Sequence, residues 1–320
     1  MVERLGPPLD KPIFEELAII GVGLIGSSVA RAARRRNAAR RIVLADRSLE
    51  VLERTKALRL GDETTTDLAR SVRNADCVML CAPVGANEEI GRVIGPALTP
   101  GAIVTDVGSV KAAVISALES VLPRSARLVP AHPVAGTEQS GPDAGFATLF
   151  INRWCILTPL GGADAEAVRK VRDLWEALGS HVETMSAAHH DLVLAITSHV
   201  PHLIAYNIVG TAADLGEVTR SEVIKFSAGG FRDFTRIAAS DPTMWRDVFL
   251  YNKDAVLEML GRFTEDLTAL QRMIRREDGE GLFDLFTRTR AIRLGIVAEG
   301  QETAAPDFGR RGADSNEPIS

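Results

Sequence analysis

Two polar side chains that could carry out acid–base chemistry follow predicted strands in the first half of the chain. Ser109 comes after the run Ile103–Asp106, and His132 comes after Leu128–Pro130. The carboxyl ends of strands in an open α/β sheet form the ligand crevice, so we expect both side chains there. The oxidation of a carbinol needs a base that takes the hydroxyl proton. Histidine suits this role because it titrates near neutrality. A histidine that precedes proline in a loop is, taken alone, more often structural.

A second group of polar residues lies in the later half of the chain. His189, His190 and Asp191 begin a long apolar segment, and His199 and His202 follow within it. The last two histidines are three residues apart and share a helical face if the helix continues through the intervening proline. Histidine pairs at this spacing can bind zinc, but the sequence offers no convincing third ligand. We therefore predict no metal site.

Two arginines follow in the segment Phe231–Ala238, which precedes Ser240–Trp245. Arg232 and Arg236 stand on either side of Asp233 in this segment. An arginine on a helix flank can hold a carboxylate through two hydrogen bonds. For either arginine alone, a surface ion pair is the simpler interpretation.

A glycine-rich turn follows the first predicted strand and opens a predicted helix. Gly21 permits a tight turn, Gly23 lets the backbone approach a pyrophosphate, and Gly26 lets the helix pack on the strand. Leu24 and Ile25 lie within this motif and are expected beside the cofactor. The N-terminus of the helix that follows offers unpaired N–H groups and the positive end of its dipole to the phosphates. The pattern predicts a dinucleotide site.

Asp46 ends the second predicted strand, 20 residues after Gly26. An acid there accepts hydrogen bonds from ribose hydroxyls and repels a 2′-phosphate, so NAD is favoured. The adjacent Arg47 could hold that phosphate instead, so NADP remains an alternative. Pro83, at the end of another strand, is expected beside the cofactor. A cluster of arginines between these elements is interpreted as a solvated face rather than a phosphate or nucleic-acid site: Arg31, Arg34, Arg35, Arg36, Arg40 and Arg41.

Short apolar runs alternate with amphipathic segments through the first half of the chain. This alternation predicts a parallel, doubly wound sheet of the Rossmann type. The predicted strands are Leu17–Ile20, Ile42–Ala45, Cys77–Ala82, Ile103–Asp106, Leu128–Pro130, Trp154–Thr158 and His181–Thr184. Helices are predicted over Ser28–Arg36 and Leu49–Leu60, and a third begins at its cap Asp164 and ends at Gly179.

After Met185 the strand pattern stops and only helical patterns remain. Long helices are predicted from Ala187 to about Leu215, from Asp241-Pro242 to about Arg276, and over Gly281–Val297. Helices as apolar as these indicate a dimer interface. The predicted organisation is a dinucleotide-binding domain over residues 1–185, an all-helical substrate and dimerisation domain over 186–298, and a disordered tail over 299–320.

The composition is that of a soluble globular protein of about two domains. The 320 residues are 46% hydrophobic and 25% charged, with a net charge of -5 that calls for no nucleic-acid partner. Three cysteines in apolar stretches indicate buried thiols rather than disulfides. The N-terminus lacks a signal-peptide pattern, and the apolar stretch Leu192–Gly210 carries several polar groups that a membrane span would rarely carry. We expect a cytoplasmic protein without a membrane association.

Five motifs in this order resemble the prephenate/arogenate dehydrogenase family. The resemblance covers about residues 15–298, and the last four motifs are more specific than the glycine turn. Ser27, where the family often has a further glycine, departs from the pattern beyond the phosphate turn. The motifs are Gly21-x-Gly-Leu-Ile-Gly26, Asp106-x-Gly-Ser-Val-Lys111, His132-Pro-x-Ala-Gly-Thr-Glu138, Ser198-His-x-Pro-His202 and Asp233-Phe-Thr-Arg-Ile-Ala238.

The resemblance implies roles for the residues at matching positions. His132 would take the proton of the substrate's ring hydroxyl, Ser109 would orient that hydroxyl and the nicotinamide, and Arg236 would bind a substrate carboxylate. His202 would contact the substrate from the helical domain. Four further residues would support or shape the pocket: His199, Asp233, Glu138 and Trp245. The family also implies a homodimer formed by the helical domain.

The implied reaction is oxidative decarboxylation of prephenate or arogenate with NAD as hydride acceptor. The resemblance does not distinguish the keto acid from the amino acid. A rival with a similar layout is a β-hydroxyacid dehydrogenase or imine reductase, which typically has a catalytic lysine in its helical domain. Lys225 and Lys253 stand in no such pattern. A regulator that binds NAD without turnover is a rival from another class.

Overall fold

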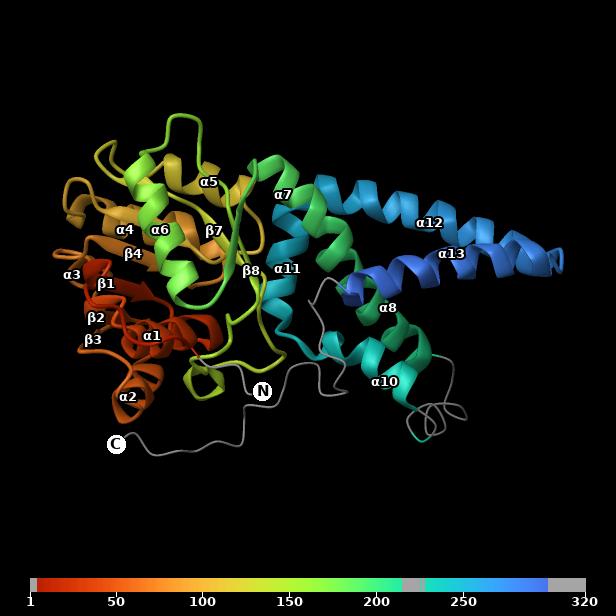
Figure 1. Ribbon diagram of the computed structural model, residues 1–320, viewed down its shortest axis with the longest axis horizontal. Helices are drawn as coiled ribbons and strands as arrows, with labels where there is room; N and C mark the ends of the chain where they lie inside the picture. Colours follow the sequence, from red (N-terminus) through yellow and green to blue (C-terminus); the bar gives the residue numbers. More distant parts are fainter. Residues whose placement is uncertain (1–4, 215–224, 226–227, 299–320) are drawn as a thin grey trace. The chain divides into compact units, whose positions relative to one another are not determined.

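Six parallel strands form the sheet at the centre of the N-terminal part of the protein, in the order β3-β2-β1-β4-β5-β6 (Figure 1). This is the strand order of the Rossmann fold, and it confirms the predicted fold class. The strands are β1 (Phe14–Ile20), β2 (Ala39–Ala45), β3 (Glu63–Thr65), β4 (Cys77–Leu80), β5 (Ile103–Asp106) and β6 (Arg127–Leu128). The short edge strand β3 was not expected from the sequence.

The computed structural model describes residues 5–214, 225 and 228–298. The chain forms two compact units, Met1–Leu257 and Glu258–Ser320. The first unit holds the Rossmann sheet and the first helices of the C-terminal half. The predicted tail, 299–320, and the predicted helix end at Leu215 lie outside the described residues. The predicted domain boundary at residue 185 remains a prediction.

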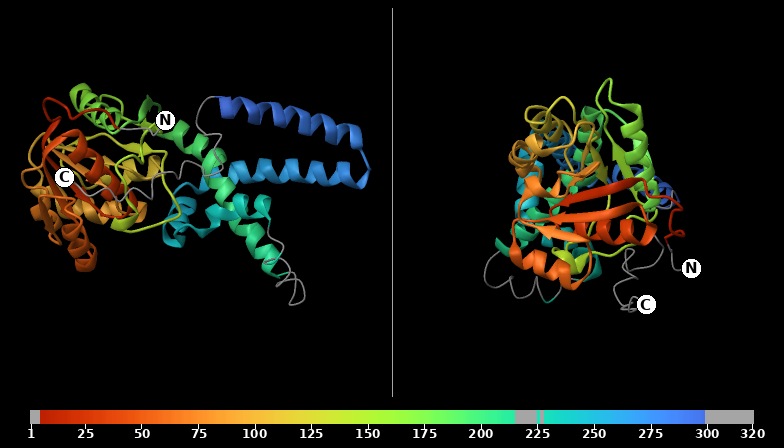
Figure 2. Two further views of the ribbon diagram at one scale, coloured as in Figure 1. Left: turned by 60° about the horizontal axis from the view of Figure 1, so that its bottom comes forward. Right: turned by 90° about the vertical axis from the view of Figure 1, so that its left-hand side faces the viewer.

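Both faces of the sheet are covered, because successive side chains of a strand point to opposite sides. Leu17 and Ile19 of β1 lie in one core with α1 and α6, whereas Ala18 and Ile20 lie in a second core with α4 and α5. The right-hand view of Figure 2 shows strands with helices on both sides. The helices of this part are α1 (Leu24–Arg36), α2 (Leu49–Ala57), α3 (Leu68–Ser71), α4 (Asn87–Ile94), α5 (Ala112–Glu119) and α6 (Ala165–Ala177).

A second, three-stranded sheet carries the chain away from the Rossmann strands. It contains β7 (Ala131–Pro133), β8 (Trp154–Leu157) and β9 (His181–Thr184), in which β7 pairs antiparallel and β9 parallel to β8. The predicted strand Leu128–Pro130 is therefore wrong in its extent. The chain leaves the first sheet after Leu128, and a new strand begins at Ala131. His132 lies within this strand, not in a loop.

The end signals predicted for α6 are confirmed. The Asp164 carboxylate accepts a hydrogen bond from the Ala167 amide at 2.8 Å, and Gly179 has a φ of +99° just beyond the helix end. Asp241 caps α11 (Pro242–Tyr251) in the same way through the Met244 amide at 2.8 Å. These caps agree with the expectation because they depend on local sequence alone.

The predicted long helix after Met185 is present but contains a π-helical segment. It consists of α7 (Ala187–Leu194), the π-helical η4 (Ala195–His199) and α8 (Val200–Asp214). Pro201 lacks an N–H group and its ring crowds the carbonyl one turn earlier, so a wider turn before it relieves both problems. The Ser198 carbonyl accepts a hydrogen bond from Nδ1 of His202 at 2.8 Å.

The single helix predicted from Asp241-Pro242 to Arg276 is wrong. Asn252 has non-helical backbone angles (φ −113°, ψ 29°) and separates α11 from α12 (Lys253–Arg275). Its side-chain amide donates to the Asp191 carbonyl at 2.8 Å and lies 3.1 Å from Nδ1 of His199. These contacts with α7 and η4 fix the position at which the chain turns, and the hydrophobic period could not reveal them.

The second unit contains most of α12 and the last described helix, α13 (Gly279–Ala298), joined by a short connection at 276–278. Both helices carry exposed large apolar side chains, among them Ile274, Phe283, Phe286 and Ile292. Large apolar side chains that are exposed on a helix are typical of a surface that binds another protein chain.

Candidate active site

The glycine turn between β1 and α1 has the geometry that a dinucleotide site needs. Gly21 has a φ of +93°, and a Cβ there would lie 2.8 Å from the Cys81 carbonyl group. A Cβ on Gly26 would lie 2.1 Å from the Gly21 carbonyl oxygen, so only glycine lets the helix start so close to the strand. A Cβ on Gly23 would meet nothing within 4 Å. That open position is where a pyrophosphate could approach the backbone.

Asp46 holds the same turn from the end of β2. Its carboxylate accepts hydrogen bonds from the amides of Val22 and Ser48, both at 2.9 Å. Each carboxylate oxygen can accept more than one hydrogen bond, so these contacts are compatible with ribose hydroxyls as further donors. Leu24 and Ile25 form the first turn of α1, and Pro83 is exposed just after β4. The cofactor residues predicted from the sequence thus surround the edge between β1 and β4.

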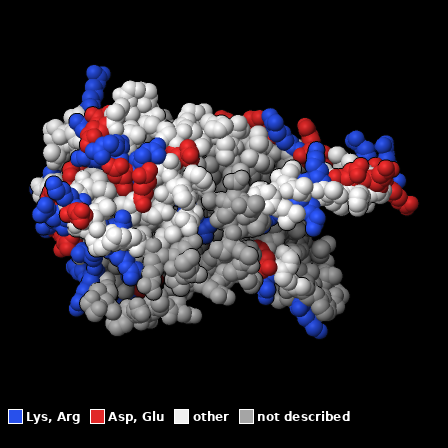
Figure 3. Space-filling view, viewed as in Figure 1, with Lys and Arg blue, Asp and Glu red and all other residues white. Residues whose placement is uncertain are grey.

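Three of the arginines in the cluster form ion pairs on the protein surface, whereas Arg31 and Arg36 donate to the backbone carbonyls of Pro142 and Ala177. Arg34 contacts Asp62 at 3.0 Å, Arg40 contacts Glu15, and Arg41 contacts Glu16 at 3.1 Å. Figure 3 shows basic and acidic side chains interspersed on one face of the molecule. Ion pairs at a solvated surface account for Arg34, Arg40 and Arg41 without a phosphate or nucleic-acid ligand.

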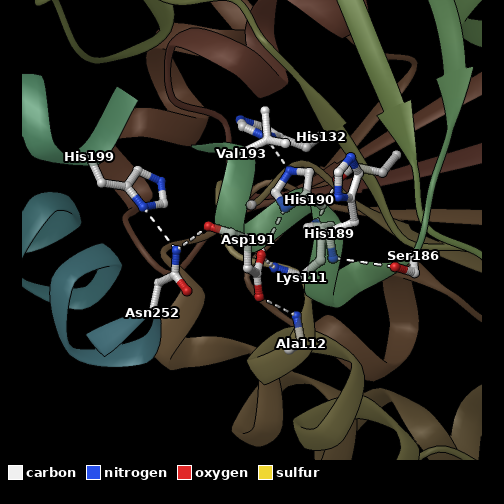
Figure 4. Close-up of polar contacts among 12 residues, drawn as sticks. Lys111, Ala112, His132, Ser186, His189, His190, Asp191, Val193, His199 and Asn252 are labelled. Carbon is white, nitrogen blue, oxygen red and sulfur yellow. Dashed lines mark hydrogen bonds and ion pairs between the residues drawn. The ribbon is translucent and has the colours of Figure 1, made fainter. Parts of the chain in front are cut away.

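His132 is buried on β7 and contacts a second histidine. Its Nδ1 lies 2.8 Å from Nε2 of His190, and Nδ1 of His190 lies 2.8 Å from the Asp191 carboxylate (Figure 4). Burial lowers the pKa of His132 well below its ordinary value, and the neighbouring His190, Lys111 and His199 act in the same direction. His132 is therefore neutral at pH 7, which is the form that can accept a proton.

Asp191 connects the helical segment to the Rossmann part. Its two carboxylate oxygens accept hydrogen bonds from the amides of Lys111 and Ala112, at 2.8 and 2.9 Å. These amides belong to the first turn of α5, where a carboxylate also interacts favourably with the helix dipole. Burial acts to raise the pKa of Asp191, but the hydrogen bonds from His190 and the two amides outweigh it, and the pKa is lowered.

A buried ion pair lies beneath these residues. The Lys111 ammonium group and the Asp106 carboxylate are both fully buried and in direct contact. Lys111 also donates to the Ala131 carbonyl at 2.7 Å, next to His132. Asp106 accepts from the amides of Gly108 at 2.8 Å and Ala131 at 3.2 Å. The pair thus joins the end of β5 to the start of β7. It fixes the position of the backbone at Ala131, next to His132.

His199 lies below the surface of the site, beside Ser109. It is fully buried, and burial lowers its pKa to about 4, while a hydrogen bond with the Ser109 backbone acts in the opposite direction. Because the Asn252 amide donates toward Nδ1 of His199, this histidine is held in one orientation. His199 is thus enclosed by protein, whereas Ser109 is partly exposed.

His202 and Trp245 form a stacked pair from two different helices. Their ring centroids are 3.6 Å apart with an interplanar angle of 23°. Trp245 also packs in a small apolar cluster with Val110, next to Ser109. Burial lowers the pKa of His202 to about 4, so this ring is neutral at pH 7. Since Nδ1 of His202 donates to the Ser198 carbonyl, its Nε2 is left as an acceptor.

Arg236 reaches the segment that follows His132. It lies in η5 (Arg236–Ala239), after α10 (Gly229–Thr235), and its guanidinium contacts the Glu138 carboxylate at 3.2 Å. Asp233 is about half exposed and lies 3.6 Å from its neighbour Arg232. The structure therefore brings Arg236 and Glu138 together, whereas the Asp233 contact is one between adjacent surface residues.

These contacts gather most of the predicted residues at the carboxyl edge of the Rossmann sheet. The resulting arrangement combines a neutral histidine, a cationic guanidinium and an aromatic wall beside a dinucleotide turn. Such a set can accept a proton, hold an anion and position an apolar ring. Among the described residues there is no group of three histidine, cysteine, aspartate or glutamate side chains that could hold a metal ion. His190 and Asn252 were given no role in the sequence analysis, although both organise the site.

Comparison with known families decides the identity of the chain. The model of the prephenate dehydrogenase nucleotide-binding domain matches residues 29–184, and that of the prephenate dehydrogenase dimerization domain matches residues 186–288. The chain belongs to the prephenate dehydrogenase family. The predictions of the family, of the Rossmann fold and of an NAD-dependent dehydrogenase are thereby confirmed.

Similar proteins cover nearly the whole chain. A cyclohexadienyl dehydrogenase of Zymomonas mobilis is 44% identical, over 90% of this chain and 98% of its own length. A prephenate dehydrogenase of Bacillus subtilis is 34% identical, over 92% of this chain and 79% of its own. The solved prephenate dehydrogenase of A. aeolicus, in complex with hydroxyphenyl propionate and NAD+, has a TM-score of 0.83 and 36% identity, covering 88% of this chain and 98% of that one.

The helical run Ala187–Asp214 is long and apolar enough to cross a membrane by length and composition alone. Within it, however, His190, Asp191 and His199 are buried and have protein partners on β7, α5 and Asn252. Buried ionisable residues with partners in the Rossmann part fit a helix that packs on protein. We retain the interpretation of this run as a helix of the substrate domain.

The glycine turn yields a prediction from two matched substitutions. Gly23→Ala should weaken NAD binding about tenfold or more while changing the free energy of unfolding by less than about 1 kcal/mol, because its Cβ enters open space. Gly26→Ala should destabilise the fold by about 1–3 kcal/mol, because its Cβ overlaps the Gly21 carbonyl. Calorimetric NAD titration and thermal denaturation measure the two effects. Unchanged NAD affinity in Gly23→Ala would contradict the assignment.

Proposed function

We propose that the protein oxidises prephenate, arogenate or both, with loss of CO2 and reduction of NAD, in tyrosine biosynthesis. The observation that carries this proposal is the buried, neutral His132 at the edge of a dinucleotide-binding sheet, in a segment that also reaches the guanidinium of Arg236 through Glu138. The family membership, and the substrates in the names of its members, favour this reaction over other NAD-dependent oxidations.

His132 is the proposed proton acceptor for the ring hydroxyl. It takes the hydroxyl proton as the carbinol carbon is oxidised, and it returns the proton to the phenolic oxygen when the ring becomes aromatic. Because its pKa is lowered by burial, the ring is unprotonated before the reaction begins. Ser109 is proposed to orient the hydroxyl group, since it is partly exposed at the end of β5 close to His199.

Arg236 is the proposed anchor for a substrate carboxylate. Glu138 contacts its guanidinium at 3.2 Å and fixes it relative to the His132 segment. An anchor must hold the acid without over-stabilising a carboxylate that departs, so partial neutralisation by Glu138 suits this position. The stacked rings of His202 and Trp245 provide a flat wall against which the substrate ring could pack. His199 and Asp233 are proposed as supporting residues.

NAD fits the glycine turn described above. When bound, it supplies the hydride acceptor. Gly23 offers open space for the pyrophosphate, and the first turn of α1 at Leu24 and Ile25 offers amide donors. Asp46 is proposed to bind the ribose and to disfavour NADP, although the exposed Arg47 next to it could accommodate a 2′-phosphate.

The protein is proposed to be a homodimer formed by its helical domain. The second family model is named for dimerization, and it covers the helices that expose large apolar side chains. Among these side chains are Ile208, Val209, Phe283 and Phe286. A soluble monomer would leave these apolar side chains in water. Sedimentation equilibrium should give twice the chain mass of 34.4 kDa; the mass of a single chain would contradict the proposal. The cytoplasm is the proposed location.

Reduction of NAD at 340 nm by the purified protein tests the function. Prephenate and arogenate are compared at saturating NAD, and each is repeated with NADP. Turnover with either acid supports the proposal, and the ratio of the two kcat/KM values assigns the preferred substrate. A folded protein that binds NAD but turns over neither acid with either cofactor would discard it.

His132→Asn should lower kcat by roughly 10²–10⁴, the usual contribution of a general base. The asparagine is close in size and keeps a polar group on β7, so the fold should persist. Circular dichroism and NAD titration serve as controls for folding and cofactor binding. A variant that keeps the wild-type kcat would rule out proton transfer to His132.

Arg236→Gln should raise KM for the substrate by at least tenfold and should affect the affinity for NAD little. The substitution removes the charge that attracts a carboxylate but leaves a hydrogen-bonding side chain opposite Glu138. Arg232 is an exposed arginine on the preceding helix, α10. Arg232→Gln is therefore the matched control and should leave KM unchanged. Equal KM values for the Arg236 variant and the wild type would refute carboxylate binding there.

A further inference from the structure

His190 and Asp191 form a hydrogen-bonded row with the proposed proton acceptor, His132. Neither residue has a role in the proposed reaction. Nδ1 of His132 faces Nε2 of His190, and Nδ1 of His190 faces the Asp191 carboxylate, each at 2.8 Å. Figure 4 shows the three side chains in a row, with the Lys111 and Ala112 amides on the far side of Asp191. His190 is fully buried, and Asp191 is 5% exposed.

The hydrogen bonds in this row determine which ring nitrogens carry protons. Asp191 already accepts two backbone amides, and its pKa is lowered, so it is an ionised carboxylate that can only accept. Nδ1 of His190 must therefore carry the proton that it donates to Asp191. Burial lowers the pKa of His190, so this ring is neutral and its Nε2 is an acceptor.

The tautomer of His190 determines that of His132. Since Nε2 of His190 is an acceptor, Nδ1 of His132 must carry the proton of that hydrogen bond. A neutral imidazole has one proton, so Nε2 of His132 bears a lone pair. It is the one ring nitrogen left to face a substrate hydroxyl. Asp191, acting through His190, thus imposes on His132 the tautomer that a general base needs.

We propose that His190 and Asp191 are positioning residues of the dehydrogenase reaction, which hold His132 with Nε2 unprotonated and take up the positive charge that forms when His132 accepts a proton. This inference deepens the proposed function and rests on it. The pair comes from α7, on the helical side, whereas His132 comes from β7. The base is therefore complete only when α7 is docked on the Rossmann part.

Two proton transfers along the row accompany the transfer of hydride. As hydride leaves the carbinol carbon for NAD, the hydroxyl proton passes to Nε2 of His132, and the Nδ1 proton of His132 passes to Nε2 of His190. His190 becomes an imidazolium that is ion-paired with Asp191, and His132 is neutral again. When the carboxylate leaves as CO2, the electron pair of that bond enters the ring and reaches the oxygen. The two protons then return, and the phenol forms.

The charges around the row explain why the positive charge should not stay on His132. Burial, Lys111 and His199 lower the pKa of His132. Burial and Lys111 also lower the pKa of His190, but Asp191 and Asp106 act there in the opposite direction. An imidazolium on His132 would therefore be costly in this environment, whereas one on His190 has a carboxylate at 2.8 Å. The position of Asp191 lets it stabilise that charge and cap α5 through the same carboxylate.

Asp191→Asn is the decisive substitution. With its oxygen on the Ala112 amide, the asparagine places its NH2 group where the other carboxylate oxygen accepts from Lys111 and His190. That NH2 group would donate to Nδ1 of His190 and would leave the Lys111 amide without this acceptor. That reverses both tautomers and places a proton on Nε2 of His132. We expect kcat to fall by at least about 10², as when an orienting carboxylate of a Ser–His–Asp triad becomes an amide. Substrate KM and NAD affinity should stay within about threefold.

His190→Leu and His189→Leu form a matched pair on the same helix. His189 is exposed beside His190, so its replacement should leave kcat unchanged. His190→Leu keeps the Asp191 contacts with α5 but removes the partner of His132, and kcat should again fall by at least about 10². If Asp191→Asn does not fold, this pair decides between a positioning role and no role.

Nitrogen-15 NMR of the six histidines in the wild-type holoenzyme provides a readout that does not depend on turnover. It should find His132 protonated at Nδ1 and bare at Nε2 near pH 7, with the reverse in Asp191→Asn. A merely structural role for Asp191 would leave the His132 tautomer unchanged. His132 with a proton on Nε2 in the wild type, or wild-type kcat in both His190→Leu and Asp191→Asn, would overturn the proposal.

The two proposals fail in distinguishable ways. A wild-type protein that turns over neither acid would refute the proposed function, whereas the tautomer of His132 could still be read by NMR. A wild-type protein that turns over substrate, with variants as active as itself, would refute only the positioning role.

Discussion

The Asp191 carboxylate is the interaction on which the rest of the site depends. It accepts the Lys111 and Ala112 amides at the start of α5, and it accepts Nδ1 of His190 on its own helix. One ionised group therefore attaches α7 to the Rossmann part and orients His190. Such a buried carboxylate is stable because several donors replace its lost water. The same contacts lower its pKa, which keeps it ionised at neutral pH.

Burial sets the chemistry of the histidines around this carboxylate. His199 and His202 have a pKa of about 4, and that of His132 is well below its ordinary value. The site thus contains neutral rings that accept protons or hydrogen bonds, while the guanidinium of Arg236 supplies positive charge for an anion. Because the proposed base, His132, and the proposed anchor, Arg236, are separate groups, one pocket can deprotonate a hydroxyl group and bind a carboxylate.

The sequence predicted those features that depend on local pattern. The glycine turn, the caps at Asp164 and Asp241, and the alternating strands were all expected because a few neighbouring residues determine them. The break at Asn252 and the start of β7 at Ala131 were missed, because contacts between distant segments fix them. Family motifs indicated His132 and Arg236, but no pattern indicated that His190 lies against His132. Adjacent histidine and aspartate on a helix carry no such signal alone.

The central claim is that oxidation at this site is coupled to loss of CO2, and a stoichiometry measures this most directly. The protein is incubated with NAD and with prephenate or arogenate labelled in the ring carboxylate, and NADH and labelled CO2 are counted in the same sample. The account predicts one CO2 for each NADH throughout the reaction. NADH formed without CO2 would identify a simple alcohol dehydrogenase and would contradict the account.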